Sequence, residues 1–210
     1  MDMDLINAVV TEEWQQFQQV NRQQPKAWCQ NAEEEFRQMR SSQFMVWPEE
    51  IVASYYIDLL NAKEIGANLV MEKYAFMMRD TAPEEFKELE PYLQKISLKK
   101  RKMIEEIVIL QGIMAEKFAK EYPYYAAQGR KTYTNEGSIG GTSVASYLRG
   151  ELSSYSEHTV GLYYEFVKKC AATDVNLTSL VRTNMAKMHG YASLEEVEKT
   201  LKKRWKRMQN

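Results

Sequence analysis

Residues that break helices are scarce in this sequence, which has only nine glycines and five prolines among 210 residues. No segment alternates apolar and polar side chains over several positions, which is the pattern of a half-buried strand. Apolar residues instead recur every three or four positions, as they do in amphipathic helices. We therefore predict an all-α protein, a single domain over residues 1–210 that forms an irregular bundle of about seven helices.

The chain also lacks an apolar run of about twenty residues, so no transmembrane helix is expected. Its net charge is only −1, which gives no overall field to attract nucleic acid or a membrane surface. The first residues are acidic where a signal peptide is basic. Two cysteines without metal or redox spacing suit a reducing compartment. We predict a cytoplasmic protein with no nucleic-acid partner and no membrane association.

Apolar periodicity and capping signals divide the chain into expected helices. Capping boxes are predicted at Asn31, Thr81 and Ser193, and Ser97 is a further expected N-cap. A bend is possible at Gly66. The last helix is expected to bury its apolar residues as far as Met208. The expected helices cover about residues 4–21, 31–44, 47–79, 83–90, 97–121, 142–167, 176–188 and 193–208.

The most informative stretch is the expected long helix over residues 142–167, because polar residues lie along the edge of its apolar stripe. Glu151 and His158 are seven residues apart, with Tyr155 between them. Gly150, beside Glu151, is costly in the middle of a helix. The pattern predicts polar chemistry at the edge of a core.

Other charged residues also lie at positions that face the core. Asp58 and Glu72 fall on the otherwise apolar stripe of the expected helix over residues 47–79. One interpretation is a ligand pocket between helices, with carboxylates for acid–base work. The other is an internal network in which arginines pair with buried carboxylates. The candidate catalytic residues are Glu72, Glu151, Tyr155 and His158, and the candidate binding residues are Glu13, Arg40, Asp58, Arg149 and Arg130.

The two interpretations share one structural expectation. Asp58, Glu72 and Glu151 should be largely buried, and each should contact Arg40, Arg149, Lys73 or a tyrosine hydroxyl. No metal or cofactor is predicted, because the chain has two histidines and no Glu-x-x-His motif of the di-iron bundles. The one long loop, residues 122–141, ends in GSIGG, which we interpret as a flexible hinge and not as a P-loop.

Two stretches, EKYAFMMRDTAPEE at residues 72–85 and SYLRGELSSYSEHT at residues 146–159, resemble the domain-of-unknown-function family 4125. Further similarity lies in EEWQQFQQV, WCQNAEEEFRQMRSSQF, SYYIDLLNAKEIGANL and HGYASLEEVE, so the resemblance extends over nearly the whole chain. It implies a helical intracellular protein of bacteria without an established activity. The GSIGG glycines depart from the usual pattern of the family.

Two classes of function follow from these patterns. The first is binding or conversion of a small molecule at a polar, carboxylate-rich pocket between helices. The alternative is a non-catalytic helical module that binds a protein partner or a second copy of itself, with a purely structural polar cluster. The candidate pocket favours the first class.

Overall fold

The computed structural model describes residues 2–20, 28–133 and 142–209. These residues form eleven α-helices, two short 3-10 helices and no strand. The α-helices are α1 (Met3–Phe17), α2 (Glu33–Phe44), α3 (Glu49–Glu64), α4 (Leu69–Thr81), α5 (Pro83–Leu89), α6 (Leu98–Glu121), α7 (Pro123–Ala126), α8 (Val144–Ser154), α9 (Glu157–Ala172), α10 (Leu177–Met188) and α11 (Leu194–Met208). The 3-10 helices are η1 (Trp28–Asn31) and η2 (Glu90–Tyr92).

The all-α class is confirmed, but there are more helices than the predicted number of about seven, in part because two expected long helices break and because the short α7 lies in the expected loop. The expected helix over residues 47–79 is two helices, α3 and α4. Gly66 has a φ of +72°, which is outside the helical region and easy only for glycine. Asn68 then caps α4, since its side-chain oxygen accepts a hydrogen bond from the Met71 amide.

The expected helix over residues 142–167 also breaks, so the prediction of one continuous helix is wrong. Tyr155 is extended, with ψ at 164°, and Ser156 caps α9 by accepting a hydrogen bond from the Thr159 amide. The carboxylate of Asp58 holds this junction, because it accepts from the Ser156 amide at 2.9 Å and the Thr159 hydroxyl at 2.7 Å. Glu151 and His158 therefore lie on different helices.

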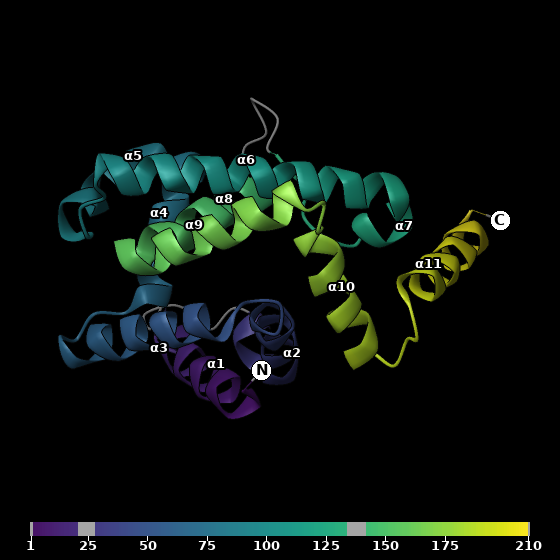
Figure 1. The fold of residues 1–210 in the computed structure, drawn as a ribbon, viewed down its shortest axis with the longest axis horizontal. Helices are drawn as coiled ribbons and strands as arrows, with labels where there is room; N and C mark the ends of the chain where they lie inside the picture. The colour runs from purple at the N-terminus through teal and green to yellow at the C-terminus, as the bar shows by residue number, and fades with distance from the viewer. Residues whose placement is uncertain (1, 21–27, 134–141, 210) are drawn as a thin grey trace.

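Helices α8 and α9 occupy the middle of the molecule. Figure 1 shows them between the long α6 on one side and α1 to α3 on the other. Helix α4 packs along α8 at a close approach. A Cβ atom on Gly150 would lie 2.8 Å from the carbonyl oxygen of Lys73, so only glycine fits there without moving α4. The glycine that is costly in a helix is therefore a packing residue.

The main core lies between these helices and includes Phe44, Leu59, Ile107 and Val160, each buried. A smaller apolar cluster joins the end of α6 to α7, α10 and α11. Its buried members are Phe118, Tyr122, Tyr125, Ala186, Leu194 and Val197. Burial of each large apolar side chain stabilises the fold by about 1.5–3 kcal/mol.

The capping predictions have mixed outcomes. Ser97 and Ser193 cap α6 and α11 as predicted, with side-chain oxygens that accept from the amides three residues on. The boxes predicted at Asn31 and Thr81 are wrong. Helices α2 and α5 follow Ala32 and Ala82, which have no capping side chain. The Thr81 hydroxyl instead donates to the Met77 carbonyl within α4.

The end of α11 also differs from its prediction. Leu194 and Val197 are buried as expected, but Trp205 is 50% exposed and Met208 67% exposed. Figure 1 shows why: α11 runs away from the other described helices towards the C-terminus, and its last turns lie apart from them.

In the part of the chain that the structure describes, no helix is both long and apolar enough to cross a membrane. The GSIGG segment and the predicted end of the first helix near residue 21 lie outside the described residues.

Candidate functional site

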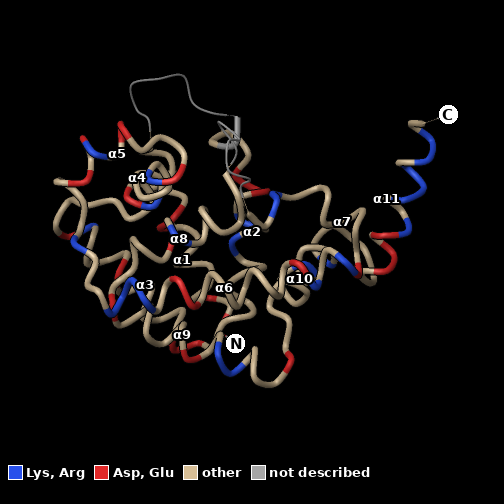
Figure 2. The backbone as a smooth tube through the Cα atoms, turned by 90° about the horizontal axis from the view of Figure 1, so that it is seen from above, with Lys and Arg blue, Asp and Glu red and all other residues tan. Residues whose placement is uncertain are grey.

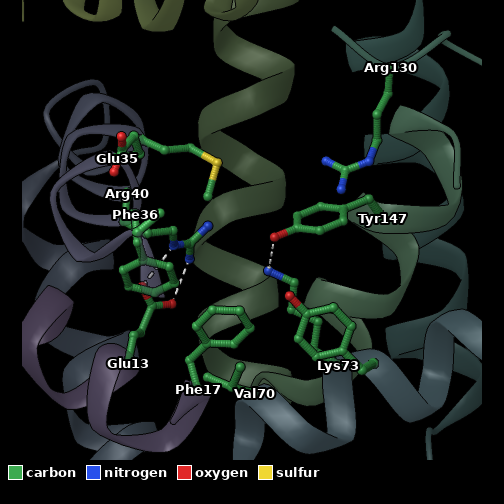
Figure 3. A pocket seen from close by; sticks show the side chains of 12 residues that line it. Glu13, Phe17, Glu35, Phe36, Arg40, Val70, Lys73, Arg130 and Tyr147 are labelled. Atoms are coloured by element: carbon green, nitrogen blue, oxygen red, sulfur yellow. Dashed lines mark hydrogen bonds and ion pairs between the residues drawn. The ribbon is translucent and has the colours of Figure 1, made fainter. Parts of the chain in front are cut away.

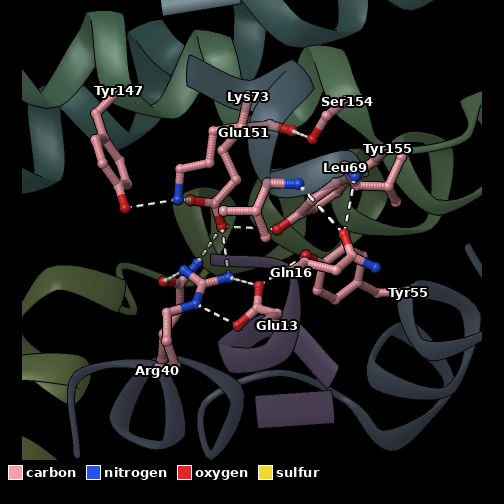
Figure 4. Close-up of polar contacts among 12 residues, drawn as sticks. Glu13, Gln16, Arg40, Tyr55, Leu69, Lys73, Tyr147, Glu151, Ser154 and Tyr155 are labelled. Carbon is pink, nitrogen blue, oxygen red and sulfur yellow. Dashed lines mark hydrogen bonds and ion pairs between the residues drawn. The ribbon is translucent and has the colours of Figure 1, made fainter. Parts of the chain in front are cut away.

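Four charged side chains meet in the middle of the molecule, where α1, α2, α4 and α8 come together (Figure 4). Arg40 donates to both carboxylate oxygens of Glu13, at 2.7 and 2.6 Å. The same guanidinium lies 3.0 Å from Glu151, whose other oxygen is 2.8 Å from the ammonium of Lys73. All four side chains are buried. We call Glu13, Arg40, Lys73 and Glu151 the buried ion cluster.

Polar neighbours complete the hydrogen bonding of this cluster. Tyr55 donates its hydroxyl hydrogen to Glu13 at 2.7 Å, and Tyr155 donates to Glu151 at 2.7 Å. Lys73 also donates to the hydroxyl oxygen of Tyr147. Gln43 accepts from Arg40 and donates to Glu151 at 3.2 Å. Two positive and two negative charges therefore balance, as burial of charge requires.

The electrostatics keep Glu151, Arg40 and Lys73 ionised. Burial opposes the charge of Glu151, but Arg40 and Lys73 outweigh burial and hold the pKa of this carboxyl well below its usual range. Burial likewise opposes the charge of Arg40, yet Glu13 and then Glu151 raise its pKa well above its usual value. For Lys73, burial is again outweighed, chiefly by Glu151, and the pKa is raised. A carboxylate with so low a pKa does not exchange protons near neutral pH.

Close packing of α4 against α8 explains how Lys73 reaches Glu151. The α4 backbone at Lys73 runs directly over Gly150. The next residue of α8, Glu151, then points at the Lys73 ammonium. The break after α8 turns Tyr155 back into the core, where it is 1% exposed and its ring lies 4.2 Å from that of Tyr55.

Two candidate carboxylates lie outside the cluster. Asp58 is half-buried and binds the α8–α9 junction, and half-buried Glu72 accepts from the side-chain amide of Gln94 at 2.8 Å. Among the described residues, neither has a hydrogen bond or ion pair with Arg40, Arg149, Lys73 or a tyrosine hydroxyl, so that part of the expectation is wrong. For Glu151 the expectation is confirmed. His158 is exposed on α9 and does not reach the cluster.

Arg149 belongs to a separate, partly exposed group. Its guanidinium binds both oxygens of Glu105, at 2.8 and 2.9 Å, and one oxygen of Asp80 at 2.9 Å. These ion pairs join α8 to α6 and α4. Arg149 is thus bound by two carboxylates outside the buried ion cluster.

Lys100 is a buried polar residue that the sequence analysis missed. Its ammonium donates to the carbonyl oxygens of Ser153 and Tyr155, so it closes the open end of α8. Burial lowers the pKa of Lys100 to about 8, although Asp58 and Glu72 act in the opposite direction. The residue lies in the first turn of α6, within the basic run at residues 99–102, and a run of basic residues usually indicates a solvated helix face.

A pocket of about 500 Å³ opens beside the buried ion cluster, between α2, α6, α8 and α10. Glu151 and Gln43 form part of its wall, so the pocket reaches the edge of the cluster. Most of the wall is apolar. Its large apolar side chains are Met39, Val46, Trp47, Val144, Leu148, Leu177, Val181 and Met185. We call this space the interhelical pocket.

A smaller neighbouring pocket of about 210 Å³ shares part of this wall (Figure 3). Glu35, Met39, Arg130 and Tyr147 line both spaces. In Figure 3, Arg130 lies above the Tyr147 ring, and Glu35 is on the opposite side. The small pocket borders Glu13, Arg40 and Lys73, so the two spaces together flank the buried ion cluster.

Sequence reasoning anticipated Glu13, Arg40, Glu151 and Arg130 at these spaces, but it missed most of the pocket wall. Arg182, on α10, is the clearest omission. Among the described residues, no group of three or more His, Cys, Asp or Glu side chains is arranged to hold a metal ion.

Comparison with known proteins identifies the chain only at the level of a family. The sequence profile described as "Protein of unknown function (DUF4125)" matches residues 3–199. No curated protein matches the chain. No solved structure matches it either.

Proposed function

This chain belongs to the DUF4125 family of proteins of unknown function, and we propose that it binds a small organic molecule in the interhelical pocket. The observation that carries the proposal is the pocket itself. Its volume of about 500 Å³ falls in the range of ligand sites, ~300–1,000 Å³. Its wall combines apolar side chains from three helices and from the segment between α2 and α3 with a few polar groups, as ligand sites do.

The state of the cluster favours binding over acid–base catalysis. Glu151 is the carboxylate where the pocket wall meets the buried ion cluster, and its oxygens already accept from Arg40, Lys73 and Tyr155. A general base needs a pKa near the working pH, whereas the pKa of Glu151 is held far below it. Glu151 therefore serves to fix the helices around the pocket. Neither Glu72 nor His158 lines the pocket, so neither is placed to act on a ligand there.

A neutral fluorescent probe, N-phenylnaphthylamine, tests the proposal without knowledge of the natural ligand. Its emission rises when it enters an apolar site, so titration of the folded protein gives an affinity and a stoichiometry. We expect one saturable site. Val181→Trp places a bulky ring in the pocket and should abolish binding, whereas Val181→Ala, at the same position, should preserve it. Equal binding to both variants would place the probe elsewhere and contradict the proposal.

The alternative, a module for self-association, is favoured by α11. Its exposed end carries Trp205 and Met208 together with six basic residues, and Figure 2 shows this blue end standing apart. The basic residues are Lys199, Lys202, Lys203, Arg204, Lys206 and Arg207. Helix α5, at the opposite end of the molecule in Figure 1, exposes Glu84, Glu85 and Glu88.

Charge complementarity between these two ends would join copies head to tail. Sedimentation equilibrium at low and high salt tests this alternative. Association that weakens with salt and disappears in Trp205→Glu supports it. A monomer at every concentration in low salt rules it out.

A further inference from the structure

The interhelical pocket carries an excess of unneutralised positive charge at one side. Arg130 and Arg182 both line it, and neither forms an ion pair with a carboxylate in the described ranges of the chain. In contrast, Arg40 and Arg149 are each bound by two carboxylates. The pocket therefore borders two guanidinium groups that retain their capacity for an anion.

An aromatic ring lies beside each of the two guanidinium groups. The Arg130 group lies 4.7 Å from the centre of the Tyr147 ring, and the Arg182 group lies 5.4 Å from the centre of the Tyr125 ring. A Cβ atom on Gly129 would be only 2.7 Å from a terminal nitrogen of Arg182. Arg182 thus lies directly against the residue that precedes Arg130. Aromatic faces support guanidinium groups while leaving their edges free to donate.

Negative charge on the pocket wall does not neutralise the positive charge of Arg130 and Arg182. The charge of Glu151 is balanced within the buried ion cluster by Arg40 and Lys73. Glu35 is the other acidic residue of the wall, and Figure 3 shows it across from Arg130. The pocket is therefore polarised, with positive charge on the side of residues 129–130 and α10, and a single carboxylate on the side of α2.

From this arrangement we infer that the ligand is an organic acid, with an apolar body in the interhelical pocket and its anionic group held by Arg130 and Arg182. The apolar walls from Trp47, Val181 and Met185 suit an aromatic or aliphatic body. Two guanidinium groups suit a carboxylate, sulfonate or phosphate. This inference rests on the proposed function, because it requires that the pocket binds a ligand at all.

Two probes that differ by one charge test the preference for an anion separately from the proposal that the pocket binds a ligand. Anilinonaphthalenesulfonate and N-phenylnaphthylamine share the same aromatic body, but only the first carries an anionic group. We expect the wild type to bind the anionic probe at least about tenfold more tightly, as charge-assisted hydrogen bonds to arginine would provide. In Arg130→Gln/Arg182→Gln this preference should disappear, while the affinity for the neutral probe stays within about twofold.

The matched control is Arg101→Gln/Arg204→Gln, which removes the same charge from exposed positions outside the pocket wall. It should retain the preference. Circular dichroism and the unfolding temperature verify that each variant is folded. Equal affinity of the wild type for both probes, or a preference that survives the loss of Arg130 and Arg182, overturns the inference and leaves the pocket proposal standing. Failure of both probes to bind, or binding unaffected by Val181→Trp, overturns the pocket proposal and the inference together.

Discussion

Arg40 on α2 lies 3.0 Å from Glu151 on α8, and the side chains are only 2% and 3% exposed. The guanidinium also binds Glu13 on α1, and Glu151 also binds Lys73 on α4. One chain of ion pairs therefore connects four helices. Because each buried charge depends on its neighbours, the loss of one partner leaves another charge uncompensated in the core.

Neutralising Glu151 should strongly destabilise the protein. In Glu151→Gln the shape is retained, but Arg40 and Lys73 lose a shared carboxylate. Removing one partner of a buried ion pair costs about 3–5 kcal/mol, and we expect a loss of this order in urea unfolding. Glu72→Gln is the matched control, because Glu72 is half-buried and its acceptor role towards Gln94 survives in an amide. Its effect should stay within about 1 kcal/mol. Similar small effects in both variants would contradict the account of the cluster.

Replacing Gly150 by alanine should destabilise the protein, although helix propensity alone predicts a gain of about 1 kcal/mol. The added Cβ would lie 2.8 Å from the Lys73 carbonyl oxygen and would force α4 away from α8. Gly161, inside α9, has no atom of the described residues within 4 Å of the position of an added Cβ. Gly161→Ala should therefore show the propensity gain. Thermal unfolding of both variants shows whether each substitution raises or lowers the stability. A stabilised Gly150→Ala would disprove the close approach of α4 and α8.

Acid should lower the stability of the folded protein through Glu151. The pKa of this carboxyl is lowered in the folded state, so below an unfolded value of about 4.3 the unfolded chain takes up a proton that the folded chain does not. The contribution of Glu151 to stability is thus present above about pH 4.3 and is lost as the pH falls further. The difference in unfolding free energy between wild type and Glu151→Gln should narrow in acid. Urea unfolding of both proteins between about pH 6 and about pH 3 measures this difference. A difference that stays constant over this range would contradict the predicted role of Glu151.

Alkaline pH should raise the stability of the protein through the deprotonation of Lys100. Its folded pKa is lowered to about 8 by burial, against about 10.4 in the unfolded chain. Between these values the unfolded state binds more protons, so the stability rises with pH. Neutral Lys100 retains hydrogens for both carbonyl groups at the end of α8. The stability of the wild type relative to Lys100→Met should therefore increase from pH 8 to pH 10, as measured by urea unfolding at each pH. A decrease would mean that the charged form is favoured by folding.

Local signals in the sequence predicted the fold class and several helix ends, because caps such as Ser97 and Ser193 act within one turn. The break between α8 and α9 was missed, although Ser156 is a good N-cap residue. The apolar stripe continues across Ser156 and conceals the break. What fixes the break is distant in sequence: Asp58 and Lys100 satisfy its backbone groups.

The candidate site also contains residues that the sequence predicted and residues that it did not. Glu13, Arg40 and Glu151 were predicted because a charged residue beside an apolar stripe requires a buried partner. Which residues pair depends on how the helices pack, and that is decided by contacts such as the one between Gly150 and α4. Arg182 gave no signal at all, since a lone arginine on an amphipathic helix is usually solvated. Only the packing of α10 against α2 and α6 places it at a pocket.

The most direct test of the binding account is nuclear magnetic resonance of methionine methyl groups during titration with N-phenylnaphthylamine. Met39 and Met185 line the interhelical pocket, whereas Met103 is buried in the main core and Met208 is exposed at the end of α11. We predict saturable shifts at Met39 and Met185, with Met103 and Met208 unchanged, and loss of these shifts in Val181→Trp. Shifts confined to Met208, or no shift at Met39 and Met185 at saturating probe, would contradict the claim that this pocket binds a small molecule.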